Sequence, residues 1–491
     1  MMSEIVEEKN ESPFIDIPPF VRWIIIVYFF LKSILVPFSR VLVNGEVTPN
    51  TYSRLSVDMH YSFVLLIPFI FYKKGKYGIF HPLIFPILFS LVKGALKNFD
   101  SLMIDVLNTR PLYNSVFNYA LGDLSQYQIS EYELEMKIYM LLYLLVYYAA
   151  FFLLDIKPKF RLYEQPINQK KLFKLIITLV FAVFIMGLLF FEMRGGLTHH
   201  FSSFAMGRSK ALKGLGIIFV FLNLSNILIS ILLAYDKSFF QKKIFYVITL
   251  FSVTINFLAY GSRSSIFLSI VNFAIIWVVH YKKIPYRGMI ILGVIGLFAL
   301  GVLGELRRST YSGQVNWNLL TELSFEESTN ALREEVVKRS VTKDPNIVIV
   351  SKGVSEYGLL YGKSYASAFL FFVPRFLWPD KPHSSGYYAG TLLFNSVGGT
   401  PPTTPMEAFW NFHIFGIFLI AFVQGYMHKW LVNFYLKYRH MPTTIVLLPI
   451  MLTGLSPNSL VLIHYFQEMA SVLLVFFLLG IAKPWYKKLL L

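Results

Sequence analysis

The sequence predicts an all-α polytopic membrane protein, and its composition, its length and the placement of its charges carry that prediction. Of 491 residues, 55% are hydrophobic and only 15% are charged. A soluble chain usually carries about 25% charged residues. About 20 apolar residues cross a bilayer, so about twelve spans would occupy half of this chain. A soluble multidomain enzyme is therefore excluded.

Apolar segments of suitable length recur along the whole chain and predict the transmembrane helices. We expect spans near 20–38, 59–72, 79–92, 138–154, 175–191, 215–234, 244–259, 265–280, 289–304, 409–427, 443–457 and 460–481. The chain 1–491 is then a single integral membrane domain, with a large loop at 305–408 between the ninth and tenth spans. The acidic N-terminus lacks the basic region of a signal peptide, so the first apolar segment is expected to remain as a span.

Basic residues are distributed unequally between the two sets of connections. Clusters follow alternate spans, at 73–76, 157–174, 237–243, 282–287, 429–439 and 483–488. Their density is about twice that of the opposite set, as the positive-inside rule requires. Both termini are therefore expected in the cytoplasm, with 305–408 on the outer face. The net charge of +17 reflects this bias and sites for anionic lipid or phosphate, so nucleic acid is not an expected partner.

The loop 305–408 is too long to be a mere connection and contains helix signals of its own. Ser324 and Glu327 form a capping box, and Asp344 followed by Pro345 predicts a second helix start. Apolar residues at helical spacing follow the first signal. We expect an amphipathic helix on the membrane surface there, and a lid over a lipid-borne substrate is a compatible interpretation.

Cationic side chains also occur at predicted outer membrane edges, against the positive-inside bias. The four groups are Arg194, Arg208, Lys210 and Lys213, then Arg263, then Arg307 and Arg308, then Arg375 and Lys381. Snorkelling to lipid phosphates explains any single one of them. Arg263 differs because it lies in a very short connection between two spans, where an ionisable residue indicates function. Guanidinium groups bind phosphate oxygens in bidentate geometry, so an arginine cluster at this level suits a pyrophosphate.

Several motifs of other enzyme classes are missing. The chain has no Asp-x-Asp, no HExxH, no GxxxxGK[ST], no GxSxG and no cysteine. His199 and His200 are adjacent, a spacing that does not place both on one helix face for a metal. We therefore expect no metal and no other cofactor.

One sequence stretch is similar to a known family. The segment from Arg375 to Pro382, RFLWPDKP, resembles the outer-loop signature of O-antigen polymerases of the Wzy type. Three further stretches fit that family in the same order. They are Gly261 to Ser264, Leu306 to Arg308, and Thr400 to Gly416, in which Glu407, Asn411 and Phe412 match the Glu-x-x-x-Asn-Phe pattern. The resemblance covers roughly residues 190–425.

The resemblance implies a GT-C-like membrane glycosyltransferase of the bacterial inner membrane. Such an enzyme would take a growing glycan from undecaprenyl pyrophosphate and join it to a repeat unit on a second undecaprenyl pyrophosphate. The reaction would occur at the periplasmic face, without a nucleotide sugar. Membrane lipids, a chain-length regulator and a flippase are the further expected partners.

This chemistry suggests a role for each candidate residue. The leaving pyrophosphate must be stabilised where its charge develops, for which the candidates are Arg263, Arg308, Arg375, Arg307, Lys381 and Arg208. The acceptor hydroxyl needs a base, and Glu407 is the first candidate and His383 the second. The alternative for Glu407 is an ion pair with one of the arginines. Trp378 is a candidate to stack on a sugar, with an interfacial position as the alternative.

Three other functions share parts of this pattern. An O-antigen ligase would use the same donor with a lipid A core acceptor, and RFLWPDKP favours the polymerase over it. A polyprenyl-phosphate sugar transferase would carry acidic residues close together in its first outer loop, whereas Glu46 and Asp58 are far apart in sequence. A lipid-linked glycan flippase would place cations within the spans and have two similar halves.

Overall fold

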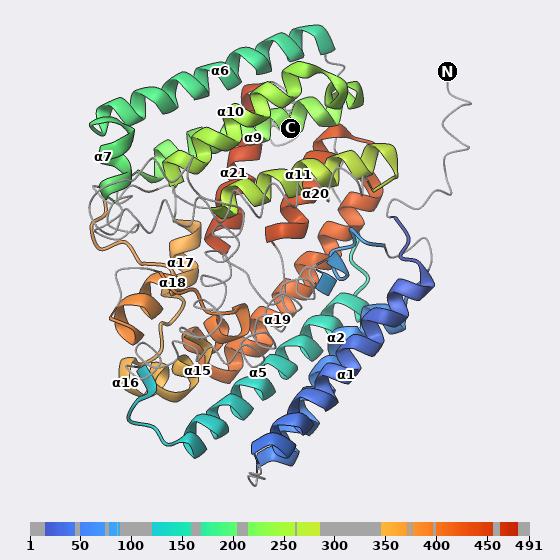
Figure 1. Cartoon of the computed structure of the whole chain (residues 1–491), viewed down its shortest axis with the longest axis vertical. Helices are drawn as coiled ribbons and strands as arrows, with labels where there is room; N and C mark the ends of the chain where they lie inside the picture. The colour runs from blue at the N-terminus through green and yellow to red at the C-terminus, as the bar shows by residue number, and fades with distance from the viewer. Residues whose placement is uncertain are drawn as a thin grey trace, which may run out of the picture.

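The regular elements in the described part of the chain are all helical (Figure 1). The computed structural model describes residues 15–44, 50–73, 78–85, 87–88, 120–158, 168–203, 215–260, 263–284, 345–370, 373, 377–395, 399–454 and 462–479. The longer helices are α1 (Pro19–Asn44), α2 (Asn50–Ile70), α5 (Gln126–Leu153), α6 (Gln169–Met193), α9 (Gly216–Tyr235), α10 (Lys243–Tyr260), α11 (Arg263–Tyr281), α19 (Thr404–Tyr438), α20 (Pro442–Gly454) and α21 (Leu462–Leu478). The short elements are α7 (Gly196–Ser202), η3 (Lys237–Gln241), α15 (Pro345–Val348), η5 (Ile349–Gly353), α16 (Val354–Tyr357), α17 (Lys363–Phe369), α18 (Ser385–Tyr388) and η6 (Ala389–Leu393).

Within the described ranges, three helices are long and apolar enough to cross a membrane. They are Tyr127–Leu153 in α5, Gln169–Met193, which is α6, and Thr404–Tyr438, which is α19. Shorter apolar helices occupy most of the other expected spans. Of the two exceptions, 79–92 forms turns and a bend over 79–84 and is helical at 85, 87 and 88, and 289–304 lies outside the described residues. These features support an all-α membrane protein, and the count of about twelve spans stays a prediction.

Side chains that accept backbone hydrogen bonds fix where several helices begin. Ser125 precedes α5 and forms a reciprocal capping box with Gln128. Asn168 precedes α6 and accepts hydrogen bonds from the two backbone amides at its first turn. α15 begins at Pro345, which confirms the second helix start expected in the 305–408 loop. The first expected start, at Ser324, lies outside the described residues.

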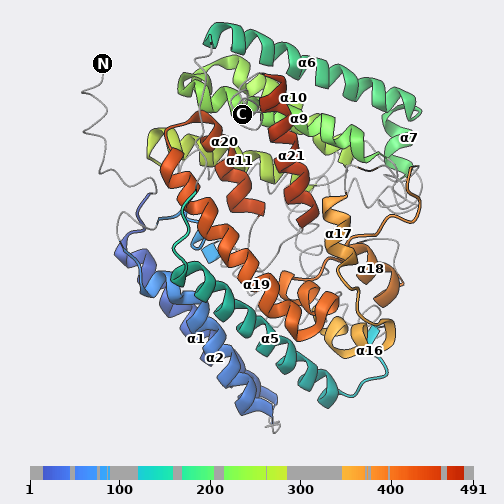
Figure 2. The ribbon, with the colours of Figure 1, turned by 180° about the vertical axis from the view of Figure 1, so that it is seen from behind.

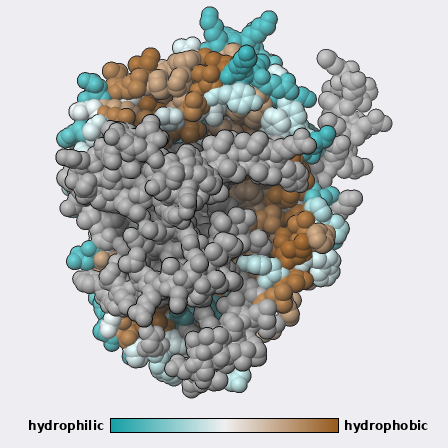
Figure 3. Space-filling model, in the orientation of Figure 1, coloured by the Kyte–Doolittle hydropathy of each residue, from teal (hydrophilic) through white to brown (hydrophobic). Residues whose placement is uncertain are grey.

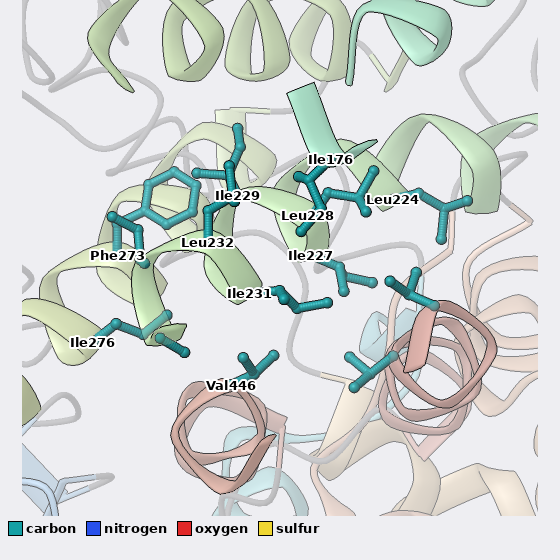
Figure 4. Packing of buried hydrophobic residues seen from close by; sticks show 14 of the residues in the cluster. Ile176, Leu224, Ile227, Leu228, Ile229, Ile231, Leu232, Phe273, Ile276 and Val446 are labelled. Atoms are coloured by element: carbon teal, nitrogen blue, oxygen red, sulfur yellow. The ribbon is translucent and has the colours of Figure 1, made fainter. Parts of the chain in front are cut away.

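The buried side chains form two hydrophobic cores that share one helix. The first core lies among α6, α9, α10, α11, α20 and α21, and Figure 4 shows part of it, including Ile176, Ile229 and Val446. The second core joins α1, α2, α5, the 345–395 segment and α19, on both sides of residue 412. Leu431 and Tyr435, near the end of α19, belong to the first core. α19 therefore ties the two cores together, and both ribbon views show it passing between them (Figures 1 and 2).

α6 is apolar on its outer face as well as on its packed face. Its buried residues include Leu172, Ile176 and Val183, whereas Ile185 and Leu189 are more than half exposed. Figure 3 shows hydrophobic residues over this edge of the molecule, with hydrophilic residues gathered at the end where α6 begins. A helix that is hydrophobic all round is typical of a membrane span.

α5 and α19 make the most extensive helix pair in the described structure. The backbones approach closely at Gly425, where an added Cβ would lie 2.4 Å from the Tyr147 carbonyl oxygen. Two buried polar pairs join the same interface. The Tyr143 hydroxyl donates to Gln424 Oε1, and the Tyr147 hydroxyl is hydrogen-bonded to His428 Nδ1 at 2.5 Å. Small residues and interhelical hydrogen bonds are what hold helices together within a bilayer.

Candidate active site at the break in α19

α19 is broken between its first two turns and the rest of its length. Phe412 and His413 have non-helical backbone angles, and His413 has a φ of 56°. Beyond the break, Gly416 lies so close to the first part that an added Cβ would be 2.1 Å from the Ala408 carbonyl oxygen. Only glycine fits there without displacing backbone, so Gly416 allows the helix to fold back at this point.

Contacts with α5 show how sharp the break is. Phe409 stacks on Tyr139, with 4.7 Å between the ring centroids, and Gln424 bonds to Tyr143. The two tyrosines are one helical turn apart, or about 6 Å along the axis. A straight helix would separate Phe409 from Gln424 by roughly 22 Å. The first part of α19 must therefore turn away from the axis of the second part.

The 358–362 segment satisfies the carbonyl groups that the break releases. The backbone amides of Leu360 and Tyr361 donate to the carbonyl oxygens of Trp410 and Asn411, at 3.0 and 3.1 Å. The indole N–H of Trp410 donates in turn to the backbone of the same region, at 3.2 Å from the carbonyl oxygens of Gly353 and Gly358. Non-helical backbone at membrane depth needs such partners, because lipid offers none.

Glu407 lies in the first part of α19 with its carboxylate held by hydroxyl groups. Its side chain is 5% exposed. The Ser364 hydroxyl, on α17, donates to Glu407 Oε1 at 2.7 Å, and the Ser385 side chain, on α18, supplies a second hydrogen bond. One helical turn further on, the Asn411 amide donates to the Ser364 hydroxyl and to the Glu407 carbonyl oxygen, both at 2.8 Å. Three separate segments thus converge on one carboxylate.

Further polar groups surround this carboxylate and retain hydrogen-bonding capacity. Tyr143 and Tyr365 lie close enough to Glu407 to interact with it electrostatically. Within the described part of the chain, the buried Asn411 Oδ1 and the buried Tyr365 hydroxyl have no hydrogen-bond partner. A buried polar atom without a partner is costly, and such atoms concentrate where a ligand or a water completes the site. A buried carboxylate beside free donors and acceptors has the hydrogen-bonding groups of a general base that acts on a hydroxyl.

The other described candidates lie in the segment next to this carboxylate. The Lys381 ammonium donates to the Val373 carbonyl oxygen at 3.0 Å. The His383 ring stacks on Tyr387, with 3.7 Å between centroids. Trp378 is 42% exposed. Glu407 is bonded to Ser385, which follows His383 by two residues, so both predicted base candidates fall in one region.

Most of the predicted pyrophosphate-binding residues cannot be placed. Arg208, Arg307, Arg308 and Arg375 lie outside the described residues. Arg263 begins α11, with its backbone alone described. The arginine cluster therefore stays a prediction, and so does the ion pair between Glu407 and an arginine.

Sequence reasoning selected Glu407 but not the residues that hold it. Asn411 had a usable signal, because residues four apart lie on one helix face. Ser364 and Ser385 had none, since their proximity to Glu407 arises only in the folded chain. Comparisons with family models, curated proteins and solved structures found no match to this chain.

Proposed function

We propose that this chain is a membrane glycosyltransferase that polymerises oligosaccharide repeat units carried on undecaprenyl pyrophosphate. In this proposal it is an O-antigen polymerase of the Wzy type, GT-C-like, with about twelve spans in the bacterial inner membrane. One observation carries the proposal. Glu407 is buried, lies at a break in a candidate membrane span, and has hydroxyl groups as its described hydrogen-bond partners. An ionisable group in that position indicates function by default.

The site residues fit a direct transfer of the growing glycan. Glu407 accepts the proton of an acceptor sugar hydroxyl while the oxygen of that hydroxyl attacks the anomeric carbon of the donor glycan. The bond from that carbon to the pyrophosphate oxygen breaks, and its electron pair leaves with the pyrophosphate. The hydrogen bonds from Ser364 and Ser385 are the ones that the acceptor hydroxyl replaces. The predicted arginine cluster stabilises the charge that develops on the leaving group.

The positions of the basic residues support an outward-facing site. The start of α6, the end of α11 and the end of α19 lie towards one end of the molecule, and α16, α18 and the start of α19 lie towards the other (Figures 1 and 2). Three basic clusters of the predicted cytoplasmic connections, 157–174, 282–287 and 429–439, adjoin or overlap this first set of helix ends. Lys437 donates to the Pro158 carbonyl oxygen, and the Tyr281 hydroxyl donates to the Lys237 carbonyl oxygen. Glu407, close to the start of α19, then faces the periplasm.

A reporter experiment tests this orientation. A periplasm-dependent phosphatase fused within 310–400 should be active, and the same enzyme fused at 160–170 or after Leu491 should be silent. Reversed activities would place Glu407 on the cytoplasmic side and overturn the proposal.

Replacing the carboxylate tests the function itself. In a deletion strain, the wild-type gene should restore a ladder of surface glycan on a gel. Glu407→Gln should leave mainly a single-repeat band at normal protein level, because loss of a general base commonly costs ~10²–10⁴ in rate. Glu356→Gln is the matched control, since this exposed carboxylate lies in α16, in the same region. A wild-type ladder from Glu407→Gln would contradict the role of the base.

The deletion strain also separates the alternatives. Single-repeat glycan on the surface supports the polymerase. Free lipid-linked polymer would instead indicate a ligase, and repeat units trapped inside the cell would indicate a flippase.

Conservative replacements test the predicted pyrophosphate site. Arg263→Lys and Arg375→Lys keep the charge but lose the planar guanidinium, so both should leave mostly single-repeat glycan. Arg439→Lys, at the end of α19, should leave the ladder unchanged. Wild-type ladders from both outer variants would remove these residues from the pyrophosphate site.

A further inference from the structure

Tyr361 has a backbone conformation that a bulky residue rarely adopts. Its φ is 48°, in the left-handed region that glycine and asparagine tolerate far better than tyrosine. The residue is 73% exposed, so burial in the core does not offset the strain. A strained residue of this kind persists only where its surroundings enforce it, and such residues cluster at active sites and ligand contacts.

The break in α19 enforces this conformation, because the 360–361 backbone is hydrogen-bonded to it. The Tyr361 amide donates to the Asn411 carbonyl oxygen, and the amide of the preceding Leu360 donates to that of Trp410. Gly362 follows with a φ of 78°, and an added Cβ there would meet the Phe412 ring at 3.0 Å. The chain thus uses glycine at 362, where space demands it, and keeps tyrosine at 361, where glycine would relieve the strain.

Asn411 connects the backbone of Tyr361 to the candidate base. Its amide bonds to Asn411, whose side chain bonds both to the Glu407 carbonyl oxygen and to the Ser364 hydroxyl that holds the carboxylate. An exposed aromatic residue is therefore held, through its backbone amide, on the same residue that is hydrogen-bonded to Glu407 and to Ser364. An interfacial tyrosine that merely anchors a helix in lipid headgroups has no need of a left-handed backbone.

We infer that Tyr361 is a sugar-binding residue whose ring stacks on a pyranose of the acceptor glycan while an acceptor hydroxyl reaches Glu407. The C–H groups on one face of a pyranose carry partial positive charge, and they pack against the negative face of an aromatic ring. The ring would fix the orientation of the sugar, and the carboxylate would select the hydroxyl. This inference rests on the proposed function and assigns its acceptor subsite.

Substitution by glycine separates binding from folding, because the two roles predict opposite effects. Tyr361→Gly relieves the backbone strain, so the purified protein should be at least as stable to heat as the wild type. It should nevertheless give a shortened ladder, with acceptor KM raised roughly 2- to 10-fold. Tyr361→Phe and Tyr361→Trp keep a ring and should restore long chains. Tyr361→Asn, which also tolerates this φ, provides a second ring-free variant.

Tyr357→Ala is the matched control. Tyr357 is 44% exposed and ends α16, four residues earlier, and its φ is not positive. Its removal should leave both ladder and KM unchanged. Glu407→Gln should lower kcat instead, so the subsite and the base are told apart by which kinetic parameter changes.

A binding measurement distinguishes failure of this inference from failure of the proposed function. The probe is the oligosaccharide repeat unit released by mild acid from the host's own surface glycan, observed by saturation-transfer NMR with the full-length protein in detergent. The wild type should transfer saturation to the sugar ring protons, and the Tyr361→Gly protein should transfer markedly less. Equal transfer and equal ladders for both proteins would overturn the inference and leave the polymerase proposal standing. A deletion strain with the same glycan ladder as its parent would overturn the polymerase proposal. Absence of saturation transfer from the wild-type protein to the sugar would overturn the acceptor subsite.

Discussion

Replacing Gly416 by alanine tests whether the break in α19 positions the candidate base. An added Cβ would lie 2.1 Å from the Ala408 carbonyl oxygen, whereas ordinary contact begins near 3.4 Å. The two parts of the helix would have to separate by about 1.3 Å, the difference between those distances. Because Ala408 directly follows Glu407, the carboxylate would move with it. A displacement of about 1 Å at a reacting group commonly costs ~10²-fold in rate.

The assay for Gly416→Ala is the initial rate of repeat-unit consumption by purified protein, with thermal unfolding in detergent measured in parallel. We expect a rate lower by about 10²-fold and a stability loss of about 1–3 kcal/mol, the usual cost of overpacking. Gly353→Ala is the control, since its Cβ would meet the nearest side-chain atom, in Ile349, at an ordinary 3.4 Å. A Gly416→Ala enzyme with the wild-type rate would show that the break does not position the base.

Three further predictions concern other parts of the molecule. Gly425→Ala would drive a methyl group to 2.4 Å from the Tyr147 carbonyl oxygen, so it should lower stability by about 1–3 kcal/mol in thermal unfolding; an unchanged midpoint would contradict the close α5–α19 packing. Burial among phenylalanine rings lowers the pKa of His200 on α7. The imidazole therefore binds a proton more readily in the unfolded chain, and stability should fall as pH drops below about 6.5. His200→Phe should weaken this pH dependence of stability, and a pH profile identical to that of the wild type would argue against a contribution from His200. Polymerisation should survive EDTA, and activity that only Mg²⁺ or Mn²⁺ restored would revive a metal-dependent transferase.

Hydropathy predicted where the helices lie but not how one of them breaks. The expected spans at 138–154, 175–191 and 409–427 fall within α5, α6 and α19. Neither Phe412 nor His413 is a helix-breaking residue type, and Gly416, which permits the close approach, does not by itself mark a break, because the cause is tertiary. The carbonyl groups that it releases find partners in residues 360–361, about 50 positions earlier in the chain. A local pattern cannot report such a partner.

The candidate site was likewise predictable only in part. The sequence makes Glu407 the first base candidate because it precedes a span on the predicted outer face, whereas its burial at the start of α19 is a finding of the structure alone. Its hydroxyl partners, Ser364 and Ser385, come from the short helices α17 and α18, whose sequence carries no signal for that contact. Tyr361 was not selected either, because a positive φ at a tyrosine is imposed by the fold and is invisible in composition or spacing.

The polar pairs between α5 and α19 also have a consequence for how the protein is made. Tyr143 and Tyr147 are separated from Gln424 and His428 by 281 residues of chain. At a synthesis rate of about 5–20 residues per second, that interval is roughly 15–55 s. During this time the α5 hydroxyls lie within or beside the bilayer without their final partners, so they depend on water, lipid headgroups or an insertion factor. Nascent chains that stop before α19 would retain exposed polar groups in the membrane, which makes them natural substrates for membrane quality control.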